Sequence, residues 1–150
     1  MTTDLVVVID TNVWISGVFF RRGIPASILR AWWDSRFEIV ATAETLAELE
    51  LKLREKASNF GTDSALVEEW IDYVKTFVRI TPVTKIVSGI YRDPNDDKFL
   101  AALIGRAEYI VSGDHDLQVL GEYQNVQVLS PRAFAELLEI VPPLTSSDHV

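Results

Sequence analysis

The segment of residues 5–12, LVVVIDTN, constrains the fold of this chain most. Four consecutive apolar residues, Val6–Ile9, lead directly into Asp10. A continuous run of Val and Ile is typical of a strand buried on both faces, as in the centre of a parallel sheet. Asp10 follows the carboxyl end of that strand, where open α/β sheets place their ligand sites. The pattern predicts that Asp10 is the first of several acids that hold divalent metal.

Segments with strand and helix patterns alternate along the rest of the chain. Further strands are predicted at about residues 37–41, 78–80, 109–112 and 126–129, and helices at about 12–20, 26–36, 42–56, 64–77, 94–106, 117–120 and 131–140. Residues 83–91 fit either a loop or a short strand. This alternation predicts one three-layer α/β/α domain, residues 1–141, around a central parallel sheet of four to five strands. Residues 142–150 are expected to form a loose tail.

The composition excludes several classes of protein. The 150 residues include no Cys, which rules out a disulfide scaffold, a thiolate zinc site and a cysteine nucleophile. No apolar run reaches the roughly 18–20 residues that span a bilayer, and the N-terminus lacks the basic region of a signal peptide. We therefore expect a soluble, cytoplasmic protein with no membrane partner.

The net charge of −8 argues against a nucleic-acid substrate, because nucleic-acid binders usually carry a basic surface. Two effects weaken this objection. A bound metal ion neutralises carboxylates gathered around it, and an acidic surface elsewhere can face a basic partner.

Acidic residues recur where the predicted elements meet. Asp114 ends the segment YIVSGD much as Asp10 ends VVVID. In a doubly wound sheet two such strands are neighbours, with a crevice between their carboxyl ends. Asp96 and Asp97 open the preceding helix, and Glu48 lies within the helix of residues 42–56. Oxygen ligands without Cys or clustered His favour Mg²⁺ or Mn²⁺ over zinc.

Each of these acids also has a simpler interpretation. Asp10 could cap the following helix, and Asp114 could hydrogen-bond locally within a turn. Asp96 and Asp97 could complement the dipole of the helix that they open. Glu48 could be an exposed helix residue, and the sequence alone leaves these alternatives open.

Four segments together resemble one family, the PIN-domain nucleases. They are VVVIDTNVWIS, TLAELELKL with its Glu48, RDPNDDKFLAAL and YIVSGDHDL. The resemblance is greatest to the VapC-like toxin components of toxin–antitoxin pairs. It implies a PIN-like nuclease domain that acts as a Mg²⁺- or Mn²⁺-dependent endoribonuclease. It also implies an RNA substrate, a small antitoxin protein as inhibitor, and assembly as a homodimer.

The same resemblance implies a role for individual residues. The catalytic acids would be Asp10, Glu48, Asp97 and Asp114. The metal would be held by Asp10, Asp97, Asp114 and Asp116, with Asn12, Ser112 and Asp96 in support. Asp93 is a neighbour that could substitute for Asp97, and His115 fits an exposed bystander better than a general base.

Three other functions are alternatives, and the sequence gives an argument against each. A magnesium-dependent phosphoryl hydrolase would place a second acid two residues after its nucleophilic Asp, where this chain has Asn12. A receiver-type signalling domain would need a Lys after a late strand, and none is evident. A PIN-like module that only binds RNA or protein would fit the net acidity but gives no reason for the full set of acids.

Overall fold

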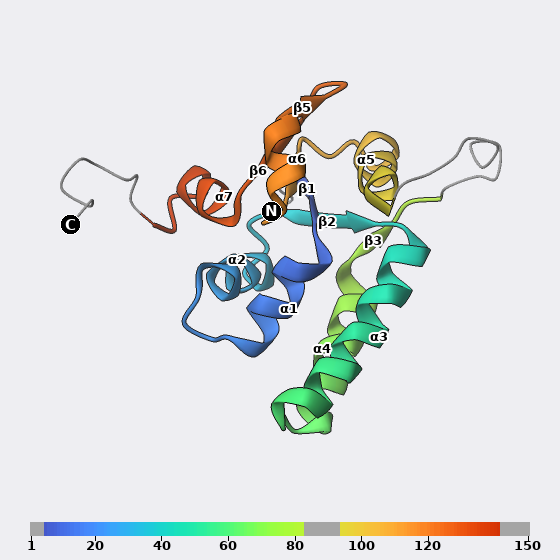
Figure 1. The fold of residues 1–150 in the computed structure, drawn as a ribbon, viewed down its shortest axis with the longest axis vertical. Coiled ribbons are helices and arrows are strands. Elements are labelled where there is room, and N and C mark those ends of the chain that lie inside the picture. The colour runs from blue at the N-terminus through green and yellow to red at the C-terminus, as the bar shows by residue number, and fades with distance from the viewer. Residues whose placement is uncertain (1–4, 83–93, 142–150) are drawn as a thin grey trace.

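The computed structural model describes residues 5–82 and 94–141, apart from the side chains of residues 94–97 and 100. The central sheet has the strand order β3-β2-β1-β4-β6-β5 (Figure 1). Its strands are β1 (Val6–Ile9), β2 (Glu38–Ala41), β3 (Arg79–Ile80), β4 (Tyr109–Val111), β5 (Glu122–Tyr123) and β6 (Val126–Leu129). The helices are α1 (Thr11–Phe19), α2 (Ile24–Trp33), α3 (Ala43–Phe60), α4 (Ser64–Phe77), α5 (Pro94–Gly105), α6 (His115–Leu120) and α7 (Pro131–Leu137).

The sheet confirms the predicted class and adds one strand to it. β3, β2, β1, β4 and β6 pair in parallel, whereas β5 pairs antiparallel with β6. Gln124 and Asn125 join β5 to β6, and both have positive φ angles, of 50° and 70°. Two successive residues in that region are typical of the tight turns that join hairpin strands. The five parallel strands agree with the predicted parallel sheet of four to five strands, and the antiparallel β5 is a sixth strand that was not predicted.

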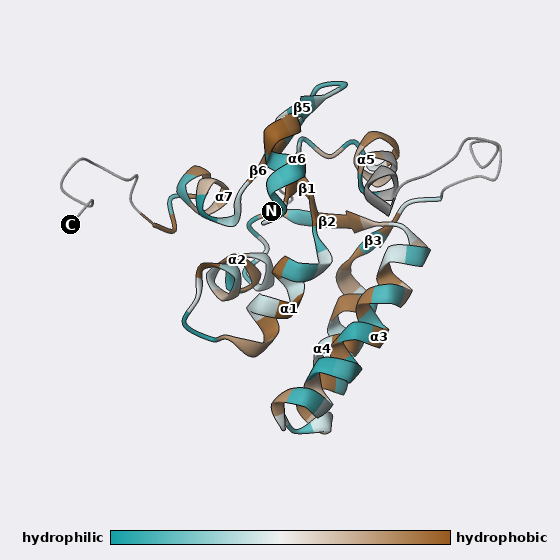
Figure 2. Ribbon diagram, viewed as in Figure 1, coloured by the Kyte–Doolittle hydropathy of each residue, from teal (hydrophilic) through white to brown (hydrophobic). Residues whose placement is uncertain are grey.

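Side chains of β1 alternate between two hydrophobic cores, as the buried-strand prediction requires. Val7 and Ile9 belong to a core shared with α1, α2, α3, α4 and α7. Val6 and Val8 belong to a second core with α5 and α6. Figure 2 shows that hydrophilic and hydrophobic residues alternate along α3. The chain thus forms three layers, with β1 in the middle of the central one.

Local sequence signals account for the start and end of α3. Thr42 caps the helix, because its hydroxyl accepts the Thr45 backbone N–H at 3.0 Å while the Thr45 hydroxyl accepts the Thr42 N–H at 3.1 Å. The helix ends at Gly61, whose φ of 63° lies in the left-handed region that favours glycine. It therefore runs to Phe60, beyond the end predicted near residue 56.

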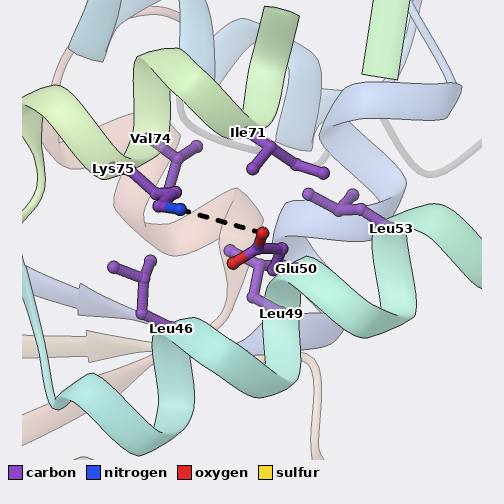
Figure 3. A pocket seen from close by; sticks show the side chains of 7 residues that line it. All are labelled: Leu46, Leu49, Glu50, Leu53, Ile71, Val74 and Lys75. Carbon is purple, nitrogen blue, oxygen red and sulfur yellow. Dashed lines mark ion pairs between the residues drawn. The ribbon is translucent and has the colours of Figure 1, made fainter. Parts of the chain in front are cut away.

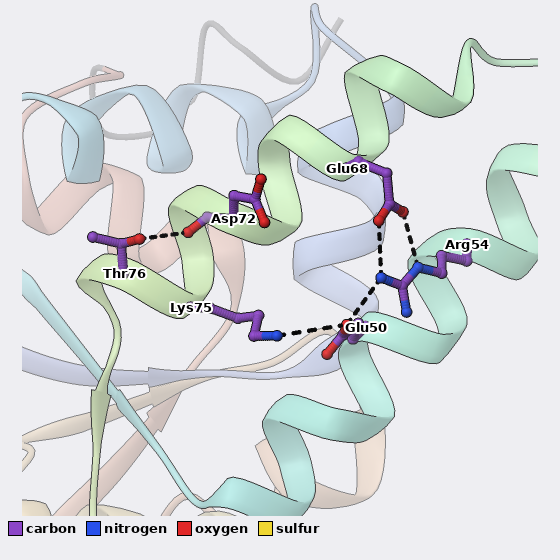
Figure 4. Close-up of polar contacts among 6 residues, drawn as sticks. All are labelled: Glu50, Arg54, Glu68, Asp72, Lys75 and Thr76. Atoms are coloured by element: carbon purple, nitrogen blue, oxygen red, sulfur yellow. Dashed lines mark hydrogen bonds and ion pairs between the residues drawn. The ribbon is translucent and has the colours of Figure 1, made fainter.

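Ion pairs join α3 to α4, and the two helices extend away from the sheet together (Figures 1 and 4). The Arg54 guanidinium donates to both carboxylate oxygens of Glu68, at 2.8 and 2.9 Å. Arg54 and Lys75 both face Glu50, at 3.0 and 3.9 Å. The hydrogen bonds from Arg54 lower the pKa of the Glu68 carboxyl below its ordinary value.

The remaining predictions concern the last helix, residues 83–91 and the absence of a membrane span. The last helix ends at Leu137, earlier than the predicted residue 140, and residues 83–91 lie outside the part that the structure describes. Within the described ranges, no helix is both long enough and apolar enough to cross a bilayer.

Candidate active site

Asp10 lies where the strand order of the sheet reverses, between the neighbouring strands β1 and β4. Its backbone N–H donates to the Val111 carbonyl at 2.9 Å, which extends the pairing of the two strands by one bond. The residue is 5% exposed and is the N-cap of α1, yet its carboxylate makes no capping hydrogen bond. The structure therefore does not support the capping interpretation of Asp10, because the carboxylate is directed to other partners.

Ser112 connects Asp10 to Asp114. The Ser112 hydroxyl is fully buried and donates to Asp10 Oδ2 at 2.6 Å. The same hydroxyl oxygen accepts the backbone N–H of Asp114 at 3.0 Å. The two acids that end β1 and β4, 104 positions apart along the chain, are thus linked through one serine. The structure therefore brings Asp10, Ser112 and Asp114 together at the carboxyl ends of β1 and β4, and their roles in a site stay a prediction.

Two further bonds fix the backbone of Ser112. Its N–H donates to the Leu129 carbonyl at 2.9 Å, and its carbonyl accepts from Gln118 Nε2 at 2.7 Å. These bonds hold the backbone from which the hydroxyl projects, while its bonds to Asp10 and Asp114 orient the hydroxyl itself. Sequence reasoning missed Gln118, because a Gln in a short helix matches no functional pattern.

Asp114 is half-buried and caps α6. Its Oδ1 accepts the Asp116 backbone N–H at 2.8 Å, the local bond that the simpler interpretation proposed. This bond uses one carboxylate oxygen and leaves Oδ2 out of the cap. A structural role and a ligand role are therefore compatible for Asp114. Asp116 itself is exposed in the first turn of the helix.

Lys98 supplies a cation to Asp10. Its Nζ lies 3.4 Å from Asp10 Oδ1, and the two side chains are only 15% and 7% exposed. Lys98 belongs to α5, and its neighbour Phe99 is buried in the second core beneath β1. Sequence reasoning missed this contact, although a single basic residue after the acidic run PNDD was an available signal.

Glu48 lies apart from this network. Its side chain is 53% exposed and pairs with Lys52 on the same helix at 3.0 Å, as expected for an ordinary exposed helix residue. Asn12 and His115 are also exposed, at the starts of α1 and α6. The structure does not bring these three residues into the hydrogen-bonded group around Asp10.

The structure does not describe the side chains of the remaining acids. Asp96 and Asp97 are in the first turn of α5, but their side chains are outside the described set, and Asp93 lies outside the described residues altogether. Among the side chains that are described, no group of three or more acidic or His residues could hold a metal ion. The convergence of Asp97 on Asp10 and Asp114 therefore stays a prediction.

The chemistry of the described donors nonetheless fits a magnesium-type ion. Such an ion takes hard oxygen ligands and commonly uses one or two protein carboxylates together with waters and substrate phosphate. Asp10 and Asp114 supply carboxylate oxygens from neighbouring strand ends. Asp10 Oδ1 already attracts a cation, the Lys98 ammonium, at a nearly buried position. The same oxygen is suited to a divalent ion.

Two pockets between helices are unrelated to this group. One lies between α3 and α4, lined by Leu46, Leu49, Glu50, Leu53, Ile71, Val74 and Lys75 (Figure 3). Its volume of about 10 Å³ holds at most one water molecule. The other, of about 120 Å³, lies between α1, α2 and α4. Neither is lined by Asp10 or Asp114, so neither extends the site.

Comparison with known proteins identifies the family. The profile of the PIN domain family matches residues 6–116, from β1 to the start of α6. An uncharacterized protein of Methanocaldococcus jannaschii is 28% identical over 143 residues, which cover 89% of this chain and 91% of that protein. The fold is similar to a chain in the crystal structure of VapBC2 from Rickettsia felis bound to a DNA fragment from their promoter. That similarity has a TM-score of 0.54 at 12% identity and covers 84% of this chain and 98% of the other. These findings confirm the resemblance stated from the sequence, and the chain belongs to the PIN domain family.

Proposed function

We propose that this chain is a metal-dependent endoribonuclease whose reaction centre is the carboxyl end of β1 and β4. One observation carries the proposal: the buried Asp10 carboxylate is held by Ser112, and the same serine holds the backbone of Asp114. Membership of the PIN domain family supports nuclease chemistry at these acids. A nuclease of this kind needs rigidly placed carboxylates, and strand ends with fixed backbones provide them.

Asp10 and Asp114, with Asp97 from α5, would hold Mg²⁺ or Mn²⁺. When bound, such an ion activates a water and neutralises charge that develops on the phosphodiester. Ser112 acts as a positioning residue, because its hydrogen bond orients the Asp10 carboxylate. Asp116, Asn12 and Asp96 remain candidates for support, and Glu48 remains a candidate acid from α3.

We also propose that the protein is the toxin of a toxin–antitoxin pair and binds a small antitoxin protein. The similarity in fold to a chain of the VapBC2 structure supports this pairing. Assembly as a homodimer is part of the same proposal. Co-expression with the product of an adjacent short reading frame tests it, because an antitoxin would co-purify with this chain and suppress its RNA cleavage.

The central experiment is incubation of purified protein with mixed RNA, with and without Mn²⁺ or Mg²⁺. Wild type and three variants are compared: Asp10→Asn, Asp114→Asn and, as a matched control, Asp72→Asn. Asp72 is an exposed residue of α4 (Figure 4) and takes no part in the hydrogen-bonded group around Asp10. We expect metal-dependent cleavage by wild type and Asp72→Asn, and a loss of at least about 100-fold in the two site variants.

Equal cleavage by wild type and Asp10→Asn would overturn the proposal. Two other outcomes would redirect it. RNA that is bound but never cleaved would indicate a PIN-like binding module. Metal-dependent hydrolysis of a simple phosphomonoester, with RNA left intact, would indicate a different phosphoryl hydrolase.

A further inference from the structure

The contact between Lys98 and Asp10 involves a carboxylate oxygen that could also ligate a divalent ion. Asp10 has two carboxylate oxygens, and Ser112 donates to one of them, Oδ2. The other, Oδ1, lies 3.4 Å from the Lys98 ammonium. A metal ion bound to Asp10 through Oδ1 would therefore meet a positive charge already in place.

We propose that Lys98 is a resident cation that competes with divalent metal for Asp10, so that metal binds only as the ammonium moves away from Oδ1. This inference rests on the proposed metal site. Two like charges that share one nearly buried oxygen repel each other. By linkage, each cation weakens the binding of the other to the carboxylate by the same factor.

The physical reason for such an arrangement is the cost of a buried charge. An ionised carboxylate that is 7% exposed is costly unless hydrogen bonds and a counter-charge compensate for lost hydration. The Lys98 ammonium supplies that counter-charge when no metal is bound. The folded chain therefore tolerates Asp10 without metal, and metal binding becomes conditional on a higher metal concentration.

The Lys98 side chain is suited to moving its ammonium away from Asp10 Oδ1 and back again. Its ammonium is carried on a flexible four-carbon stem, so the charge can move while the backbone stays in place. Phe99, the next residue of α5, is 8% exposed within the core, which anchors the helix during such a movement. Displacement of Lys98 thus needs a change of side-chain rotamer rather than a shift of α5.

Mn²⁺ binding measured by calorimetry or electron paramagnetic resonance tests the inference without any activity assay. Lys98→Gln removes the charge but keeps a hydrogen-bond donor. Lys75→Gln is the matched control, because Lys75 faces Glu50 at 3.9 Å between α3 and α4. We expect Lys98→Gln to bind Mn²⁺ about tenfold more tightly, which corresponds to about 1.4 kcal/mol, and to melt at a lower temperature without metal. Lys75→Gln should keep the wild-type affinity.

Unchanged or weaker Mn²⁺ binding by Lys98→Gln would overturn the proposal that Lys98 competes with metal for Asp10. Asp10→Asn separates this failure from failure of the site itself. If Asp10→Asn binds Mn²⁺ as well as wild type, the proposed metal site is wrong. If Asp10→Asn loses Mn²⁺ while Lys98→Gln keeps the wild-type affinity, only the role of Lys98 is wrong.

A measurement on the wild-type chain covers the case in which Lys98→Gln does not fold. During a Mg²⁺ titration followed by NMR of lysine ammonium groups, the Lys98 signal should move with the midpoint of metal binding. The Lys75 signal should stay in place. A Lys98 signal that is unchanged at saturating Mg²⁺ would contradict displacement.

Discussion

Replacing Ser112 by alanine removes one hydroxyl that serves two partners at the centre of the proposed site. The hydroxyl is fully buried, donates to the Asp10 carboxylate at 2.6 Å and accepts the Asp114 N–H at 3.0 Å. Alanine fits the same space without strain, so the loss of these two bonds dominates the effect. Ser112→Ala therefore measures the strength of the link between β1 and β4 at their carboxyl ends.

The expected magnitude follows from the two bonds. A hydrogen bond to a charged acceptor contributes about 1.5–3 kcal/mol, and the bond from the half-buried Asp114 N–H contributes about 0.5–1 kcal/mol. We therefore expect Ser112→Ala to lower the free energy of unfolding at neutral pH by about 2–4 kcal/mol. For a chain of this size each kcal/mol lowers the melting temperature by about 2–4 °C, so a decrease of about 4–16 °C is expected.

Urea unfolding followed by circular dichroism measures this change, with Ser58→Ala as control. Ser58 is exposed near the end of α3, and its replacement should change the unfolding free energy by less than about 0.5 kcal/mol. A loss below about 0.5 kcal/mol for Ser112→Ala as well would refute the assigned hydrogen bonds. In an Asp10→Ala background, Ser112→Ala should cost at least about 1 kcal/mol less than alone, because the two residues interact directly. Additive effects would show that Ser112 does not act through Asp10.

Three further predictions concern other parts of the chain. Gly17→Ala should lower the free energy of unfolding by about 1–2 kcal/mol, because an added Cβ would lie 2.5 Å from Leu29 Cδ1. Gly23→Ala is the control, since a Cβ there would meet nothing closer than 3.5 Å. Equal urea midpoints for the two variants would contradict this packing. Because the folded pKa of Glu68 lies below its ordinary value of 4.5, the pair with Arg54 stabilises the fold above that pH and loses its contribution as the pH falls through the folded pKa. An NMR titration should therefore give Glu68 a midpoint below 4.5 that rises in Arg54→Met, and an unchanged midpoint would exclude the pair as the cause. If Glu48 contributes to catalysis, Glu48→Gln should reduce RNA cleavage about 10–100-fold while Glu44→Gln does not. Equal cleavage rates for the two variants would show that Glu48 is only the exposed residue paired with Lys52.

Much of the fold was predictable because its signals are local. The run Val6–Ile9 is apolar at every position, which is typical of a strand covered on both faces. Thr42 and Ser130 mark helix starts because a short hydroxyl side chain caps the first turn, and both make the expected bonds. The two-residue strand β5 lacks any such signal, since its pairing with β6 depends on a turn whose residues adopt positive φ.

The site was predictable only as a set of acids at strand ends. Position after a buried strand identified Asp10 and Asp114, and the resemblance to PIN-domain nucleases ordered the remaining acids along the chain. The sequence did not reveal which contacts these acids make. It gave no role to Lys98, because a contact between residues far apart in the chain leaves no periodic trace. It gave none to Gln118, because a Gln in a short helix matches no functional pattern.

By itself, the sequence determined a central buried strand followed by an acid, the alternation of strands and helices, and the membership of a family. Only the tertiary structure decided that Ser112 joins Asp10 to Asp114, that Lys98 provides the neighbouring charge, and that Glu48 faces solvent beside Lys52. The physical reason is the range of the interactions. Hydrophobic periodicity and helix capping act within a few residues of one another, whereas the electrostatic environment of a buried carboxylate is set by every element that packs around it.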